Sequence, residues 1–223
     1  MTDSNVYFLP SANERAGISS ESWVELRKKI ADGAVCYISS DDCILPGLRE
    51  FCGMQITSRR QVKSTVECVI DNEELKLSIP VQKTIVVETA EVVLRDKNGQ
   101  VLMLRNKYGK GTVYTLLFAL ESALAKTPGT YDDAWWKLYR MILPKELLLS
   151  VNDSSVILTE HPLSGNECAV VAVNCSDQPK KVHLALAAKY QIASVTGDAV
   201  LNGSECELPA GGGALFIVKK SDD

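Results

Sequence analysis

Val6-Tyr7-Phe8-Leu9-Pro10 and Ala34-Val35-Cys36-Tyr37-Ile38 are the two stretches that decide the fold of the first half of this chain. Each is a short, continuous apolar run, which is the pattern of a strand buried on both faces of a parallel sheet. Between them, Trp23, Leu26 and Ile30 recur at helical spacing and form one apolar stripe. The three segments therefore predict the strand-helix-strand unit of an α/β domain.

Very little sequence precedes the first of these strands. A parallel sheet normally has several strands and both of its faces covered. The sequence therefore predicts that the sheet is either unusually small or lacks its first strands, which another segment would supply. Because such a sheet exposes an edge or an apolar face, we expect association, either as a homo-oligomer or with the missing N-terminal segment.

The middle of the chain has the pattern of antiparallel strands. Residues 62–79 contain two runs in which apolar and polar residues alternate, so we expect an antiparallel insertion beside the main sheet. Further on, the apolar runs 92–94 and 101–104 flank Asn98-Gly99, a strong hairpin signal because both residues tolerate positive φ. A third run at 112–118 completes a predicted three-strand meander.

A change of pattern marks a second domain. A helix is expected after Thr130, with Trp135, Leu138 and Ile142 on its buried stripe and Pro144 at its end. Beyond it the helical signals stop, and short strand-like runs alternate with turns at 156–158, 169–173, 182–186, 191–195 and 215–218. Such spacing is typical of a small all-β sandwich. We therefore expect an α/β domain at 1–148, with its N-terminal strands missing, and a β-sandwich at 149–223.

Composition and charge exclude several classes of function. The net charge is −4, with no basic cluster, so nucleic acid is not an expected partner. No apolar run approaches the ~18 residues of a membrane span, and no signal peptide is visible, so we expect a cytoplasmic protein. The seven cysteines include no C-x-x-C pair, and the interpretation we favour is buried, reduced thiols. We expect no cofactor and no metal.

The sequence offers little for catalysis. Its two histidines, His161 and His183, lie in strand-like runs of the second domain, and there is no G-x-S-x-G or H-E-x-x-H motif. Asp41 and Asp42 are more interesting, because they follow a predicted parallel strand, where ligand sites of α/β sheets lie. A small enzyme with its site at this loop is one hypothesis, and an ordinary solvated loop is the simpler one.

Aromatic residues suggest a second candidate site. Trp135 belongs to the buried stripe of its helix, whereas Trp136 lies about 100° further round. An exposed Trp136, with Tyr131 nearby in sequence, could stack on a sugar ring or form an interface. Burial of both tryptophans in the core is the simpler interpretation.

Several stretches resemble a family of multidomain enzymes. The segment 6–11, the helix after it and the segment 31–39 look like the strand-helix-strand of the glutamine-amidotransferase-like domain of glycoside hydrolases, similar to the trimerisation domain of family 42 β-galactosidases. The stretch from Tyr108 to Glu121 resembles a late hairpin strand of that domain. Residues from about 149 resemble its C-terminal β-sandwich, with local matches at 160–163 and 208–218.

The resemblance implies an accessory role without catalysis. In such enzymes the hydrolytic carboxylates lie on a TIM barrel, which this sequence does not contain, so the implied partner is a catalytic barrel. True amidotransferases of the superfamily carry a His two residues before a Glu; the matching stretch here ends in Glu121, and Ala119 occupies the His position. We assign no catalytic residue. A stand-alone carbohydrate-binding module is the alternative function.

Overall fold

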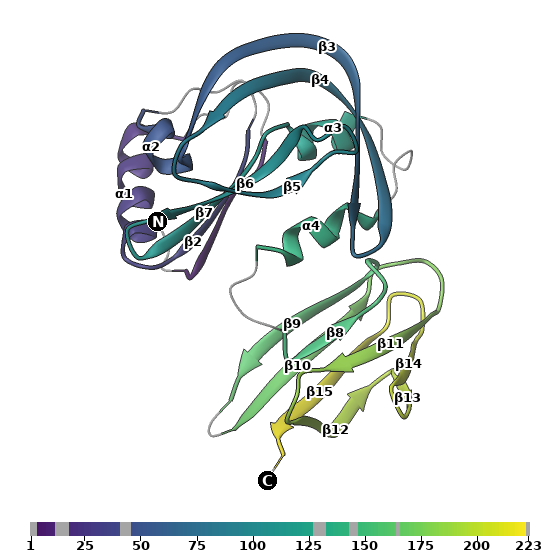
Figure 1. Cartoon of the computed structure of the whole chain (residues 1–223). Helices are drawn as coiled ribbons and strands as arrows, with labels where there is room; N and C mark the ends of the chain where they lie inside the picture. The colour runs from purple at the N-terminus through teal and green to yellow at the C-terminus, as the bar shows by residue number, and fades with distance from the viewer. Residues whose placement is uncertain are drawn as a thin grey trace. The chain divides into compact units, whose positions relative to one another are not determined.

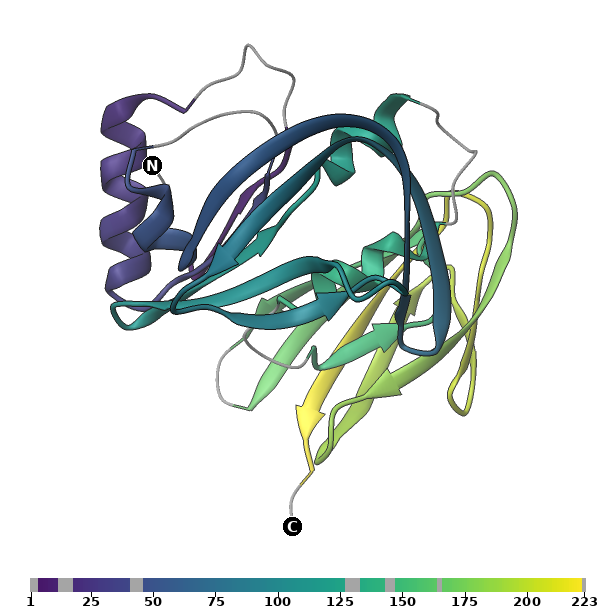
Figure 2. The same ribbon diagram turned by 45° about the horizontal axis from the view of Figure 1, so that its top comes forward.

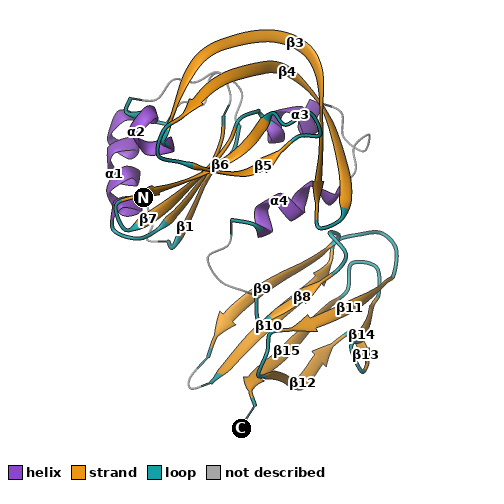
Figure 3. Ribbon diagram, viewed as in Figure 1, coloured by secondary structure: helices purple, strands orange, loops and turns teal. Residues whose placement is uncertain are grey.

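The computed structural model describes residues 4–11, 18–40, 46–126, 133–142, 147–163 and 166–221. It divides into two compact units, Met1–Pro144 (unit 1) and Lys145–Asp223 (unit 2) (Figure 1). Strands predominate over helices in both units (Figure 3). The chain is therefore mostly β, with several antiparallel sheets, and the expected parallel α/β character is confined to part of unit 1.

Unit 1 is built on a five-stranded sheet. Its strand order is β1 (Val6–Leu9), β2 (Val35–Ser39), β7 (Gly111–Leu116), β6 (Val101–Tyr108) and β5 (Glu91–Arg95). The first three strands in this order are parallel, and β7, β6 and β5 form an antiparallel meander. The predicted strand-helix-strand unit and the predicted meander are both confirmed, and they share one sheet.

Helix α1 (Ser20–Ala31) connects β1 to β2, and its ends follow the sequence signals. The Ser19 hydroxyl caps the helix by accepting a hydrogen bond from the Ser22 backbone N–H at 3.1 Å. The stripe of Trp23, Leu26 and Ile30 is buried, as predicted. It packs on one face of the sheet together with the short helix α2 (Leu48–Cys52).

Strands β3 (Met54–Ile70) and β4 (Glu73–Val87) form a long curved hairpin that is a separate two-stranded sheet (Figure 2). The predicted antiparallel insertion is confirmed but longer than the pattern indicated. Two register shifts, between Ile56 and Ser58 and between Gln61 and Ser64, interrupt the alternation that would have revealed its full length. Ion pairs from Lys97 to Glu74 (3.1 Å) and from Lys137 to Glu73 (2.5 Å) tie its far end to the rest of unit 1.

The second face of the main sheet is covered by α3 (Leu120–Lys126), the 3₁₀ turn η1 (Asp133–Trp135), α4 (Trp136–Arg140) and the far half of the hairpin. The helix expected after Thr130 is thus two short pieces among the described residues. The predicted buried stripe of this segment is nevertheless confirmed, since Trp135, Leu138 and Ile142 are all buried.

Unit 2 consists of two four-stranded antiparallel sheets. One contains β12 (Tyr190–Gly197), β15 (Gly213–Lys220), β10 (Glu167–Asn174) and β9 (Val156–Pro162). The other contains β13 (Val200–Asn202), β14 (Glu205–Leu208), β11 (Lys180–Leu186) and β8 (Leu149–Val151). Val170 and Phe216 from the first sheet share one core with Leu149 and Val182 from the second, the arrangement expected of a sandwich.

Two further expectations concern the state of the cysteines and membrane-spanning helices. Of the described cysteines, all are free thiols, and only Cys175 is exposed. Within the described part of the chain, no helix is long and apolar enough to cross a membrane.

Candidate functional site

The candidate site lies at the carboxyl ends of the parallel strands β1, β2 and β7. In open α/β sheets this edge is where ligands bind. Polar residues of unit 1 that are buried are concentrated here: Ser11 after β1, Ser39 and Ser40 at the end of β2, and Lys83 of β4, whose amine reaches the ends of β2 and β7. We name Ser11, Tyr37, Glu121 and Tyr139 the carboxyl-edge cluster.

The Glu121 carboxylate is the centre of this cluster. Its Oε1 accepts hydrogen bonds from the hydroxyls of Tyr37 at 2.9 Å and Tyr139 at 2.8 Å. Its Oε2 accepts two from Ser11, one from the backbone N–H at 3.0 Å and one from the hydroxyl at 2.8 Å. A carboxylate has about four lone-pair positions, so these four donors fill them.

The surrounding groups hold the cluster rigid. The Ser11 hydroxyl also accepts from the Ser122 N–H (3.0 Å), and the Ser122 hydroxyl donates to the Ser11 carbonyl (2.8 Å). The rings of Phe8, Tyr37 and Tyr139 lie 5.5–5.8 Å apart in tilted or edge-to-face contacts. These contacts join the end of β1, strand β2, helix α3 and helix α4 around one carboxylate.

Electrostatics keep the carboxylate charged and the phenols neutral. Burial alone would raise the pKa of Glu121, but the hydrogen bonds that it accepts, among them those from the Ser11 backbone N–H and the Tyr139 hydroxyl, outweigh burial and hold the pKa below its ordinary value of 4.5. Burial, together with the Glu121 charge, raises the pKa of both Tyr37 and Tyr139. The two phenols therefore remain donors across the neutral range.

Lys83 is the second charged group at this edge. It lies on β4 and is 6% exposed, and its ammonium donates to the carbonyls of Ser40 (2.6 Å) and Leu117 (3.3 Å). The Ser40 carbonyl directly follows β2, and the Leu117 carbonyl directly follows β7. The amine thus ties the curved hairpin to the carboxyl edge of the main sheet.

This arrangement suits structural support better than catalysis. A general base needs a free lone pair and a pKa near the working pH. Glu121 has its acceptor positions filled and a pKa below its ordinary value. The cluster's chemistry is that of a half-buried, fully bonded charge that joins secondary-structure elements.

The candidate residues predicted from sequence have different outcomes. Asp41, Asp42 and Tyr131 lie outside the described residues. Trp136 is half-buried, and the Arg140 guanidinium lies 5.3 Å from its ring centroid. The arginine lies over a face of the ring, and the use of Trp136 as a sugar-stacking or interface residue stays a prediction.

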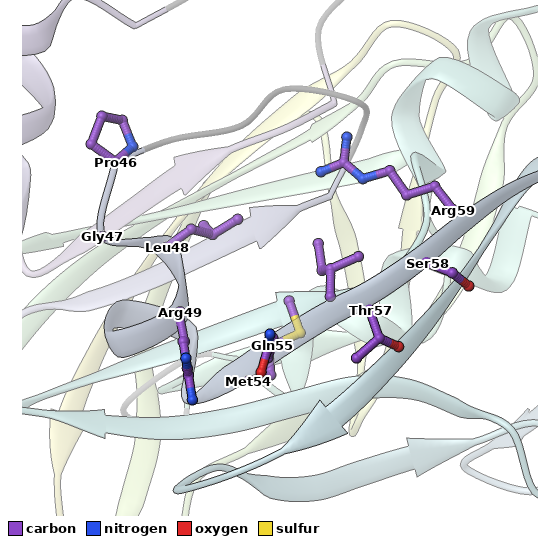
Figure 4. A pocket seen from close by; sticks show the side chains of 10 residues that line it. Pro46, Gly47, Leu48, Arg49, Met54, Gln55, Thr57, Ser58 and Arg59 are labelled. Carbon is purple, nitrogen blue, oxygen red and sulfur yellow. The ribbon is translucent and has the colours of Figure 1, made fainter.

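A groove of about 670 Å³ lies beside the start of β3 (Figure 4). Residues 46–49 and 54–59 line it, and none of them is aromatic. The Arg49 guanidinium at its edge pairs with Glu88 in two-pronged contact. Without an aromatic surface the groove lacks the usual stacking contact for a sugar ring.

The described residues contain no group of three or more His, Cys, Asp or Glu side chains placed to share an ion. The two histidines are exposed on β9 and β11 of unit 2.

Sequence reasoning missed Lys83 and the importance of Glu121. Lys83 had a signal: it falls in phase with Leu75, Leu77 and Ile79, so its side chain follows the buried side of a period-2 pattern. Glu121 had no local signal beyond the resemblance of residues 108–121, because its partners come from segments more than 80 residues away as well as nearby.

Comparison with known proteins supports the architecture. No protein-family model matches the sequence, and no curated protein matches it. Among solved structures, the chain is similar to a β-galactosidase from a Rahnella species (TM-score 0.57, 16% identity) and to a GH42 β-galactosidase from G. stearothermophilus (TM-score 0.56, 15% identity). Each match covers 97% of this chain and 32% of the other.

A third similar structure is an exo-β-1,4-mannosidase from an Opitutaceae bacterium, with a TM-score of 0.51 and 17% identity over 62% of this chain and 25% of that chain. At these identities the likeness concerns the fold. The chain spans about a third of the length of the β-galactosidases that it resembles. Its fold is that of a region of glycoside hydrolase chains.

Proposed function

We propose that this chain is the non-catalytic accessory region of a carbohydrate-active enzyme, a glycoside hydrolase, and that it supports a catalytic barrel or the assembly of an oligomer. The observation that carries the proposal is the fold likeness, which runs through both units and covers 97% of the chain. Unit 1 then corresponds to an amidotransferase-like domain and unit 2 to the β-sandwich that follows it.

The carboxyl-edge cluster supports the non-catalytic part of this proposal. In the proposed correspondence, the parallel strands β1, β2 and β7 would be the counterpart of an amidotransferase-like sheet. At its edge, Glu121 is committed to four internal hydrogen bonds. A residue that has become a structural acceptor is consistent with a domain that has kept the architecture of an amidotransferase without its reaction.

The proposed association with a catalytic barrel is tested by immunodepletion. An antibody raised against this chain is used to deplete an extract of the source cells, and hydrolysis of nitrophenyl β-D-galactoside, β-D-mannoside and β-D-glucoside is measured before and after. We expect one of these activities to fall with the chain, because a catalytic barrel is removed along with it. Non-immune antibody is the control. Unchanged hydrolysis of all three substrates after complete depletion would contradict the proposal.

A stand-alone carbohydrate-binding module is the second candidate, and it would depend on Trp136, whose side chain is partly exposed. Arg140 lies against the ring of Trp136. The test is calorimetric titration of the chain with galacto- and manno-oligosaccharides, repeated with Trp136→Ala. Heat of binding that disappears in the variant would favour this candidate over the accessory role.

A further inference from the structure

The chain contains two Asn-Gly pairs, Asn98-Gly99 and Asn202-Gly203, and each lies at the turn of a hairpin. Asparagine before glycine is chemically unstable, because the backbone nitrogen of the glycine can attack the side-chain carbonyl carbon of the asparagine. Glycine has no Cβ to shield that nitrogen. The folded structure then decides the rate, through the hydrogen bonds of the nitrogen and the ease with which the turn opens.

The turn at Asn98-Gly99, between β5 and β6, is closed by several hydrogen bonds. The Gly99 N–H donates to the Asp96 carbonyl at 3.0 Å. The Asp96 carboxylate accepts from the backbone N–H of Asn98 at 2.9 Å and of Gln100 at 2.7 Å. The Arg95 guanidinium donates to the Gly99 carbonyl at 2.8 Å. The nitrogen that would attack Asn98 is therefore held by its own hydrogen bond inside a fixed turn.

The Asn202-Gly203 pair lacks this support. Asn202 ends β13 and pairs with Glu205, so Gly203 and Ser204 form a two-residue turn. The turn is exposed, and among the residues that the structure describes nothing accepts a hydrogen bond from the Gly203 N–H. No atom lies within 4 Å of the position that a Cβ of Gly203 would take, so the turn projects into open space.

The strand that carries Asn202 is also held weakly. Strand β13 has three residues and lies at the edge of its sheet, where it pairs with β14 alone. Short edge segments with few contacts open at a low free-energy cost. Asn98-Gly99 instead leads into β6, an interior strand of eight residues. Opening of the hairpin therefore gives the backbone at Asn202 more freedom to reach the geometry of attack.

We propose that Asn202 is a site of spontaneous covalent modification in the folded chain, with water as the co-reactant. The Gly203 nitrogen loses its proton and forms a bond to Cγ of Asn202. The bond from Cγ to Nδ2 breaks, and the amide nitrogen leaves as ammonia with that proton. The cyclic imide that results takes up one water molecule. Hydrolysis at one imide carbonyl gives aspartate, and hydrolysis at the other gives isoaspartate.

Both products weaken the hairpin of β13 and β14. Each adds a carboxylate at position 202, which is paired with Glu205, and like charges in opposed positions destabilise a strand pair. Isoaspartate also adds a methylene group to the backbone, so β13 loses its register with β14. This modification concerns unit 2 alone and does not depend on the accessory role proposed for the chain.

The proposal is tested by peptide mapping of the chain after it has been kept folded at neutral pH. Trypsin cleaves after lysine and arginine, so it releases Asn98 and Asn202 in separate peptides, 98–105 and 190–219, neither with a second asparagine. We expect peptide 190–219 to gain about 1 Da at least about tenfold faster than peptide 98–105. It should also accept a methyl group from protein-isoaspartate methyltransferase. The rate should rise with pH, because the attacking nitrogen must lose its proton.

The chain unfolded in urea is the control for local sequence. Both pairs should react at similar rates there, because the contacts that distinguish them are lost. In the folded chain, Asn202→Gln should abolish the modification of peptide 190–219, and Asn98→Gln should leave it unchanged. Equal rates for the two peptides in the folded chain, a faster reaction at Asn98, or no reaction at Asn202 while the unfolded chain reacts would overturn the proposal.

Discussion

The Tyr37 and Tyr139 hydroxyls donate to the same carboxylate oxygen of Glu121, at 2.9 Å and 2.8 Å. Tyr37 belongs to β2 and Tyr139 to α4, and Glu121 lies on α3. One half-buried charge therefore joins an interior strand to two helices on the same face of the sheet. Its second oxygen, bonded to Ser11, adds the segment after β1.

Substitution of this carboxylate should destabilise unit 1. The Glu121→Gln substitution replaces one carboxylate oxygen with an amide nitrogen, which is a donor. This nitrogen would face either the two tyrosine hydroxyls or the two Ser11 donors, and those groups would lose their acceptor. We expect a loss of about 2–4 kcal/mol in the free energy of unfolding. Urea unfolding followed by tryptophan fluorescence measures it, because all three tryptophans lie in unit 1.

Glu91→Gln is the matched control for that measurement. Glu91 is 69% exposed and pairs with Arg105 on the surface of the same sheet, so its loss should change stability by no more than about 0.5 kcal/mol. Equal effects of the two substitutions would show that Glu121 is no more important than a surface charge.

The same carboxylate predicts a dependence of stability on pH. Because its folded-state pKa lies below 4.5, Glu121 contributes stability that is fully present above that pH. The contribution is lost as pH falls below 4.5 through the folded-state pKa. The difference in unfolding free energy between the parent chain and Glu121→Gln should therefore be constant from pH 6 to 8 and shrink in acid. A difference that grows in acid would contradict the assigned direction of the pKa shift.

Gly53 should not tolerate a side chain. Its φ is +66°, and a Cβ there would lie 2.5 Å from Asn106 Oδ1 and 2.6 Å from Thr89 Oγ1, which bond each other at 2.9 Å. Gly99 also has positive φ, +82°, but nothing lies within 4 Å of its Cβ position. We expect Gly99→Ala to cost about 1 kcal/mol from backbone strain alone and Gly53→Ala at least about 2 kcal/mol. Equal midpoints of unfolding for Gly53→Ala and Gly99→Ala would contradict this prediction, because they would show that crowding against Asn106 adds no cost.

Asn174 should be the most sensitive polar residue of unit 2. It is fully buried, and its amide nitrogen donates to the carbonyls of Gln178 and Pro209 at 2.8 and 2.9 Å. Its oxygen accepts from the N–H and hydroxyl of Ser176. Asn174→Ala should cost about 2–4 kcal/mol and speed amide hydrogen exchange in β10 and β14. The exposed Asn202→Ala should leave exchange unchanged.

The sequence predicted those parts of the fold whose signals are local. The stripe of Trp23, Leu26 and Ile30 identified α1, and Asn98-Gly99 identified the turn of the meander, because caps, periodicity and turn residues act over a few positions. The predominance of β structure in unit 1 was underestimated. The register shifts in β3 hid much of the hairpin, and no local signal shows that a hairpin forms a separate sheet.

The candidate site was harder to predict, because its geometry depends on distant contacts. Ser11 and Glu121 are 110 positions apart and meet only once β1 and α3 are placed by the sheet. Asp41 and Asp42 were chosen for their place after β2, and the structure shows that β2 does end at the polar edge, at Ser39 and Ser40. Position along the chain therefore located the edge but not the residues that bond there.

The most direct test of the central claim is a turnover assay of the purified chain. Hydrolysis of nitrophenyl β-D-galactoside and of L-glutamine is measured at pH 7 for the parent chain, for Glu121→Gln and for the double variant Asp41→Ala, Asp42→Ala. The account predicts the rate of buffer alone in all three. Turnover by the parent chain that either variant abolishes while its circular dichroism stays unchanged would contradict it, and would make this region an enzyme.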